Sequence, residues 1–242
     1  MTRGILIAGN ESSLFAATVA EAVKRVTSFA SALIPNRFLL PGGGVLPPRT
    51  EAAGETIPLS WNPASPISAR TLVLAAENRL EQINDAILIC SPPAVFKTAE
   101  TLTPEEIEIL ANDQIKGWFF LIRELVLYFR RRGTGSLSLV APEITSGASD
   151  INAWGKNARG KDARNKNAPA DLLGPPASAS FRAFAQGVLA SQANEPFQVM
   201  GFSAAEAGNE GDFAAWFFKL IDESAAKNSG RWHKYAKLKF FR

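Results

Sequence analysis

The short segment that begins at Gly9 has the residues best suited to bind a phosphate group. Residues 9–13 read Gly-Asn-Glu-Ser-Ser and separate an apolar run at 5–8 from a helical pattern of apolar residues at 14–23. A tight turn between a strand and a helix presents backbone N–H groups at the amino end of the helix, where phosphate binds. Gly9, Asn10 and Ser13 are therefore candidate cofactor-binding residues, in a turn that contains only one glycine.

Few other side chains in the sequence suit catalysis. Cys90 ends an apolar run and has no base beside it, so a buried core thiol is favoured over a nucleophile. His233 lies among aromatic and basic residues and is expected to pack or to lie at the surface. The two tyrosines, Tyr128 and Tyr235, are the only phenols available for proton transfer. Tyr128 falls on a long apolar helix, where a core or interface position is expected.

The composition narrows the class of protein. The 242 residues suit a single α/β domain, and 46% hydrophobic residues are enough to bury a large core. A single cysteine and a single histidine exclude an internal disulfide and leave almost nothing for a zinc site, so no metal is expected. No signal peptide or membrane-spanning run is evident, which predicts a cytoplasmic protein. The net charge of +3 gives little support for nucleic-acid binding.

Strand and helix patterns alternate along the chain. Helix start signals are clearest at Thr103-Pro104-Glu105-Glu106, a capping box with proline in the first turn, and this helix is predicted to continue to Arg132. Its second half, 118–129, is apolar on nearly every side, which is typical of a helix buried on several faces, often by another subunit. Strands are expected at 5–8, 27–34, 56–61, 85–90, 136–141 and 197–202, and further helices at 14–23, from Ser65 or Ser68 to Ile83, at 178–191 and from an Asp212 cap through 213–226.

This alternation predicts a doubly wound, mostly parallel Rossmann-type sheet with helices on both faces, in three α/β/α layers. Residues 143–176 interrupt the pattern with a long loop insertion in which basic residues are spaced, and a lid, a binding loop or disorder would each fit. A solvated loop is favoured there over a phosphate-binding one. The basic and aromatic tail, 230–242, is better explained by a last strand and arm or by subunit packing than by a membrane-surface strip.

The order of these elements resembles the short-chain dehydrogenase/reductase family over nearly the whole chain. The similarity lies in Ala8-Gly9, Asp85-Ala86-Ile87-Leu88-Ile89, Thr103-Pro104-Glu105-Glu106, Gln114-Ile115-Lys116-Gly117, Gly135-Ser136-Leu137-Ser138-Leu139-Val140, Ala177-Ser178-Ala179-Ser180-Phe181 and Ser229-Gly230-Arg231. No one of these segments is specific, whereas their order is moderately so. The resemblance implies a single Rossmann-type domain and a nicotinamide cofactor.

The family's functional positions are poorly matched. Its turn reads Thr-Gly-x-x-x-Gly-Ile-Gly, and this chain keeps only Gly9, with Ser13 and Phe15 at the later glycines and Glu11 adding negative charge. The missing glycines let the backbone approach a pyrophosphate and let the helix pack close to the strand. The family's catalytic asparagine, serine, tyrosine and lysine fall at Gln114, Pro142, Ala177 and Phe181.

Alanine and phenylalanine cannot exchange a proton or lower the pKa of a phenol, so the family mechanism is lost. The resemblance therefore indicates a degenerate member that is non-catalytic and acts in assembly or ligand sensing. No cofactor is expected. NADP is favoured if one binds, because Arg37 follows the second strand and no acid lies between Glu21 and Glu51. A solvated loop arginine is the simpler interpretation of Arg37.

Two further expectations concern partners and the alternative function. The family commonly pairs its two central helices across a two-fold axis, so a homodimer or homotetramer through helices 104–132 and 178–191 is expected. The alternative is an NADP-dependent oxidoreductase with an atypical active site, whose acid comes from the long loop or from Tyr128.

Overall fold

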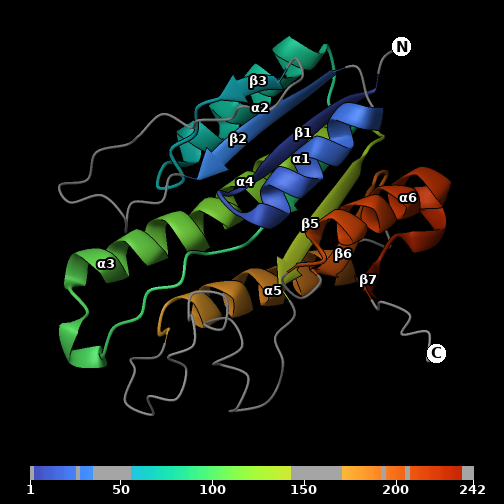
Figure 1. Ribbon diagram of the computed structural model, residues 1–242. Helices are drawn as coiled ribbons and strands as arrows, with labels where there is room; N and C mark the ends of the chain where they lie inside the picture. The colour runs from blue at the N-terminus through green and yellow to red at the C-terminus, as the bar shows by residue number, and fades with distance from the viewer. Residues whose placement is uncertain are drawn as a thin grey trace, which may run out of the picture.

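The computed structural model describes residues 3–25, 28–34, 56–142, 171–191, 195–204 and 208–235. These residues build one seven-stranded sheet in the order β3-β2-β1-β4-β5-β6-β7, with every strand parallel to its neighbours (Figure 1). The strands are β1 (Gly4–Asn10), β2 (Ser28–Ile34), β3 (Thr56–Leu59), β4 (Asp85–Ile89), β5 (Ser136–Pro142), β6 (Gln198–Ala204) and β7 (Arg231–Lys234). The predicted parallel Rossmann-type sheet is therefore confirmed.

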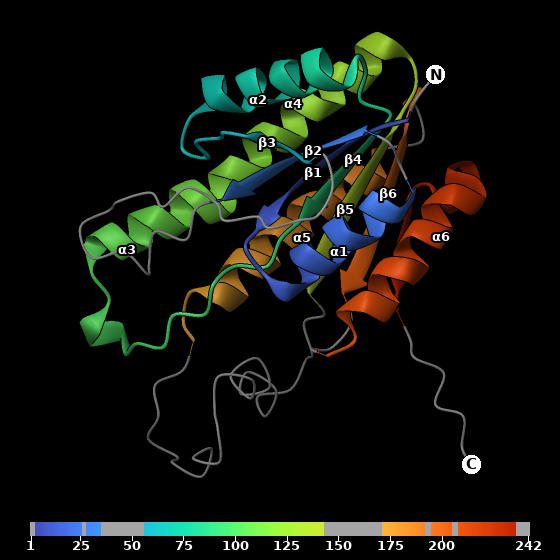
Figure 2. The same cartoon turned by 45° about the horizontal axis from the view of Figure 1, so that its top comes forward.

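Helices cover both faces of this sheet (Figure 2). One face carries α2 (Pro66–Leu80), α4 (Gly117–Arg132) and α5 (Gly174–Ala190). The other carries α1 (Ser13–Arg25) and α6 (Glu210–Asn228), which pack side by side. A short 3-10 turn, Ala99–Thr101, and α3 (Pro104–Ile109) precede α4, and α3 extends beyond the end of the sheet.

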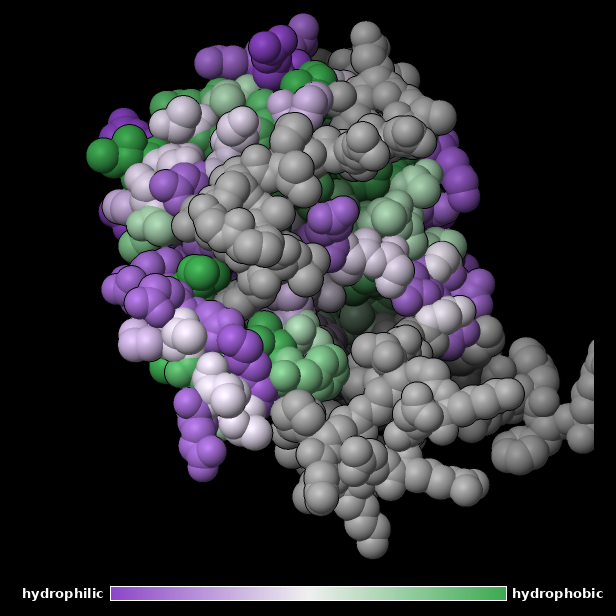
Figure 3. Space-filling model, turned by 60° about the vertical axis from the view of Figure 1, so that its left-hand side comes forward, coloured by the Kyte–Doolittle hydropathy of each residue, from purple (hydrophilic) through white to green (hydrophobic). Residues whose placement is uncertain are grey.

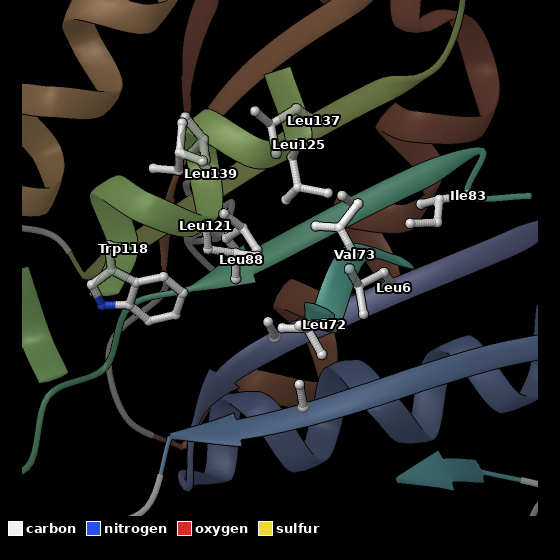
Figure 4. Close-up of a cluster of buried hydrophobic side chains, with 14 of the residues drawn as sticks. Leu6, Leu72, Val73, Ile83, Leu88, Trp118, Leu121, Leu125, Leu137 and Leu139 are labelled. Carbon is white, nitrogen blue, oxygen red and sulfur yellow. The ribbon is translucent and has the colours of Figure 1, made fainter. Parts of the chain in front are cut away.

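The strand alternation in β1 divides the core between these two layers. Leu6 and Ala8 face α2 and α4, whereas Ile5 and Ile7 face α1 and α6, and all four are fully buried. Alternate side chains point to opposite faces of a strand, so a sheet covered on both faces needs a continuous apolar run. Figure 4 shows the first of these clusters, in which leucines from β1, β4 and β5 meet side chains from α2 and α4.

Several helix boundaries follow local signals that the sequence carries. Ser65 caps α2 by accepting the N–H of Ser68 at 3.2 Å, as one of the two predicted caps. The capping box of Thr103 and Glu106 is present at α3, with Pro104 in the first turn. Pro58 lies in β3 at the edge of the sheet, where a missing N–H is tolerated.

Two predicted helix starts were wrong. The helix expected at 178–191 begins at Gly174, because Pro175 and Pro176 fit the first turn of a helix rather than the end of a loop. The helix expected after an Asp212 cap begins at Glu210 with Asn209 before it, so Asp212 lies inside the first turn, where its charge suits the helix dipole. The remainder of the predicted insertion, 143–170, and the tail from 236 lie outside the described residues.

The long helix expected from Pro104 to Arg132 is not uniform. Between α3 and α4 the chain forms a π-helical segment, Leu110–Lys116, with wider hydrogen-bonded turns. This segment turns Asp113 and Gln114 into the protein, where they are 0% and 1% exposed. The prediction of a single α-helix missed this π-helical segment. The wider turns of the segment determine where Gln114 lies.

Candidate functional site

The carboxyl ends of β1 and β4 form the edge of the sheet where an α/β protein of this strand order binds ligands. At this edge the turn after β1 is closely packed. A Cβ added at Gly9 would lie 2.5 Å from Cδ2 of Phe15 and 3.2 Å from Cβ of Ile89. Phe15 is 3% exposed and belongs to the core under α1. The absent side chain of Gly9 therefore makes room for Phe15, a part of the protein itself.

The amino end of α1 is also occupied by side chains of the chain. The Ser12 hydroxyl accepts the N–H of Phe15 at 3.1 Å, which satisfies one of the backbone donors that a helix leaves open at its start. Ser13, the first residue of α1, donates its hydroxyl to Oε1 of Glu210 at 2.8 Å. Glu11 lies exposed before them. The sequence drew attention to Glu11, whereas Glu210 is distant in the chain and was missed.

Two of the predicted site residues, Asn10 and Gln114, meet at this edge of the sheet, in what we call the crevice at the carboxyl ends of β1 and β4. The side-chain nitrogen Nδ2 of Asn10 donates to Oε1 of Gln114 at 2.9 Å. The side-chain oxygen Oδ1 of Asn10 accepts the N–H of Ser91 at 2.9 Å. Both side chains are buried. These bonds join the end of β1, the end of β4 and the π-helical segment, and they use both polar atoms of Asn10 inside the protein. Asn10 is thus placed as a structural link at the crevice.

The positions matched to the family's tyrosine and lysine lie on α5 and are fully buried. Ala177 packs in a small apolar cluster with Val95, Leu110 and Leu173. Phe181 makes an edge contact with Trp118, their ring centroids being 5.3 Å apart. Apolar side chains therefore stand at both positions.

Aromatic packing extends from Phe181 toward the start of α4. Trp118 makes a second edge contact with Trp61 at 5.8 Å. Figure 4 shows Trp118 at the start of α4, beside Leu121 and Leu88. Pro142, matched to the family's serine, ends β5 opposite Ala204 and brings no hydroxyl. Proton transfer has no side chain to carry it among these residues.

Neither tyrosine of the chain lies in the crevice. Tyr128 is 1% exposed, and its hydroxyl accepts the N–H of Ile83 at 2.9 Å. Ile83 precedes β4, so this hydroxyl lies at the amino edge of the sheet, opposite the ligand-binding edge. Tyr235 packs against Trp216 and Phe213 on the side of α6. The suggestion that Tyr128 could supply an acid is therefore wrong.

His233 is a packing residue, as the sequence suggested. Its ring stacks on Phe202 with centroids 5.3 Å apart, and Nε2 lies 3.1 Å from the carbonyl oxygen of Asn228. In the part of the chain that the structure describes, no group of three acidic, cysteine or histidine side chains is placed to hold a metal ion. Arg37, the fourth predicted cofactor-binding residue, falls outside the described residues.

Cys90 is fully buried at the end of β4, and desolvation by burial raises the pKa of its thiol well above the usual range. Because the thiolate is the reactive form, we expect the folded protein to react very slowly with a thiol-specific disulfide reagent. After denaturation, one thiol per chain should react with the reagent at the rate of a free cysteine. A rapid reaction of the native protein, followed by absorbance, would contradict this burial.

The amino end of α1 differs from the glycine-rich turn that binds a nicotinamide dinucleotide. Its pyrophosphate would need the close backbone approach that glycines provide. Here Phe15 fills the space beside Gly9, and a carboxylate of Glu210 is bonded to Ser13. This edge of the sheet thus has the position of a cofactor site, with Ser13 and Phe15 at two of the positions where the family has glycine.

A groove lies on the outer surface between α4 and α5, with a volume of about 300 Å³. Phe119 and Phe184 stack near it with ring centroids 4.1 Å apart, and the side chains of Val126 and Val188 line it while remaining partly exposed. Charged groups of both signs border it, including the ion pair of Arg130 and Glu195. The hydrogen bond from Arg130 lowers the pKa of Glu195.

Further apolar side chains are exposed on α2, α3, α4 and before α5, and Leu127 among them also lines the groove. In the described part of the chain the large ones are Ile67, Leu74, Ile107, Leu127 and Leu172. Seen from the side of α3, the surface carries hydrophobic side chains, singly and in small groups, among hydrophilic ones (Figure 3). None of the described helices is long and apolar enough to cross a membrane.

Together, the strand order and the crevice at the ends of β1 and β4 define a Rossmann-type α/β protein. No protein-family model matches the sequence, and no curated protein matches it. Solved structures do. A short-chain dehydrogenase from Mycobacterium smegmatis is 12% identical, with 98% of this chain and 94% of that chain covered and a TM-score of 0.68.

Two further solved structures are similar. An NADH-dependent reductase A1-R′ complexed with NAD is 12% identical, covering 97% of this chain and 95% of that one, with a TM-score of 0.67. A variant of the actinorhodin polyketide ketoreductase with NADPH is 13% identical, covering 97% and 96%, with a TM-score of 0.66. The chain therefore has the fold of the short-chain dehydrogenases/reductases, which confirms the fold that the resemblance implied.

Proposed function

We propose that this protein is a non-catalytic relative of the short-chain dehydrogenases/reductases that acts in assembly or as a ligand-sensing domain. The observation that carries the proposal is the presence of Ala177 and Phe181, both fully buried, at the positions of the family's tyrosine and lysine. A reductase of this kind needs a phenol there to exchange a proton with the substrate oxygen, and an ammonium group to lower the pKa of that phenol. The chain has two tyrosines, and both are held elsewhere.

The proposal extends to the cofactor. The packing of Phe15 against Gly9 and the buried bonds of Asn10 support the absence of a bound nicotinamide dinucleotide. If one does bind, NADP is the expected form, since Arg37 remains the basic residue after β2. The single cysteine, Cys90, is consistent with a reducing, cytoplasmic setting.

Assembly would use a second copy of the chain, packed through α4 and α5 as a homodimer or as part of a homotetramer. Support comes from the groove, which has a partly exposed apolar centre and charged borders of both signs. A two-fold axis places the same surface patch of the two subunits face to face. A surface that carries both Arg130 and Glu195 can therefore be complementary to its own copy. No nucleic acid or membrane takes part in the proposal.

The alternative is an NADP-dependent oxidoreductase with an atypical active site. The similar solved structures favour it, because two of them are reductases described with NAD or NADPH. Light scattering of the wild-type protein separates the two, together with an assay of NADPH oxidation over a panel of ketones and aldehydes. The proposal predicts a mass of two or four chains and no turnover above the blank. A stable monomer would refute assembly, and steady turnover would establish the alternative.

A further inference from the structure

The first turn of α1 has an acidic neighbour from the other end of the chain. Glu210 is the first residue of α6, and α6 lies beside α1 on the same face of the sheet (Figures 1 and 2). Its Oε1 accepts the Ser13 hydroxyl at 2.8 Å, and its Oε2 accepts the N–H of Gly208 at 2.8 Å. Each oxygen of the carboxylate thus has a donor, one from α1 and one from the segment that leads into α6.

The position of this carboxylate has a physical meaning. The amino end of a helix carries partial positive charge and open N–H groups, and it attracts anions. In this fold the pyrophosphate of a dinucleotide meets the backbone at the residue that is Ser13 here. The carboxylate of Glu210 lies within hydrogen-bonding distance of Ser13, so the chain itself places a negative charge there.

Two ion pairs hold α6 in place at the opposite end of α1. Arg25, the last residue of α1, pairs with Asp222 of α6 at 2.8 Å, and Arg3 also reaches Asp222. Because contacts join the two helices near both ends, a rigid shift of α6 that removed Glu210 from Ser13 would also break these pairs.

We propose that Glu210 is a built-in anion that closes the amino end of α1 against phosphate groups. The inference rests on the proposed loss of the cofactor and names a cause for it that is separate from the packing of Phe15. Phe15 removes space beside Gly9, whereas Glu210 removes the electrostatic attraction that a pyrophosphate would need.

The test compares the wild-type chain of 242 residues with Glu210→Gln, which keeps the shape and removes the charge. Glu223→Gln is the matched control, since Glu223 lies exposed on the same helix and pairs with Lys219 at 3.5 Å. Glu210→Asp keeps the charge. Each protein is titrated with inorganic pyrophosphate by calorimetry, and circular dichroism confirms that it is folded. Glu210→Gln should bind about tenfold more tightly than the wild type, while the other two should not.

Equal pyrophosphate affinity in the wild type and in Glu210→Gln would overturn the inference. So would a gain of the same size in Glu210→Asp or in Glu223→Gln, because the effect would then not be the charge at this position. NADPH oxidation by the wild type, measured on the same preparations, would refute the proposed function instead. That result leaves the pyrophosphate comparison intact, so the two failures can be told apart.

Discussion

Replacing Phe181 by lysine, the residue that the family resemblance places there, is expected to destabilise the protein by about 3–5 kcal/mol and to restore no activity. Phe181 is fully buried and contacts the ring of Trp118. The substitution removes these ring contacts and leaves an ammonium group without water. Such a group either stays charged at high cost or loses its proton.

Urea unfolding followed by circular dichroism measures this effect. Ala179→Lys is the matched control, because residue 179 is exposed on the same helix and gains the same side chain. We expect the free energy of unfolding of this control to lie within about 0.5 kcal/mol of that of the wild type. A Phe181→Lys variant as stable as the control would show that the crevice admits water and a polar group, and the non-catalytic interpretation would lose its main support.

Replacing Val126 by glutamate is expected to weaken self-association at least about a hundredfold. Val126 lines the groove between α4 and α5 and is partly exposed. Across a two-fold axis the new carboxylate would face its own copy in an apolar setting, and such a like-charge contact costs several kcal/mol. Sedimentation or light scattering over a range of concentrations gives the dissociation constant.

The control for this substitution is Ile67→Glu on α2. Ile67 is 76% exposed and does not line the groove, so this variant should associate like the wild type. Circular dichroism of both variants shows whether the single chain remains folded. Equal association of Val126→Glu and the wild type would place the subunit contact on another surface.

The sequence predicted the fold well because the relevant signals are local. The apolar run around Ile5 and the capping box at Thr103 each depend on neighbouring residues, and the structure has both. The π-helical segment that turns Gln114 inward has no such local signal. Its wider turns accompany packing against distant parts of the chain, such as the close approach of Gly117 to Pro63.

The candidate site was predicted only in part, for the same reason. Gly9, Asn10 and Ser13 could be named from the turn, since their role follows from their position between a strand and a helix. Their partners could not, because Gln114 and Glu210 are 104 and 197 residues away in the chain from Asn10 and Ser13. The sequence indicated that Gly9 remains from a cofactor-binding turn. The structure shows that the absence of a side chain at Gly9 also leaves space for the ring of Phe15.

The most direct test of the central claim is a titration of the wild-type protein with NADPH, observed by the fluorescence of the nicotinamide ring. Because Phe15 packs against Gly9 and Glu210 is bonded to Ser13, we predict no saturable change up to about 1 mM, the upper end of common Michaelis constants. Calorimetry under the same conditions should register only dilution. Saturable binding of one NADPH per chain would contradict the account.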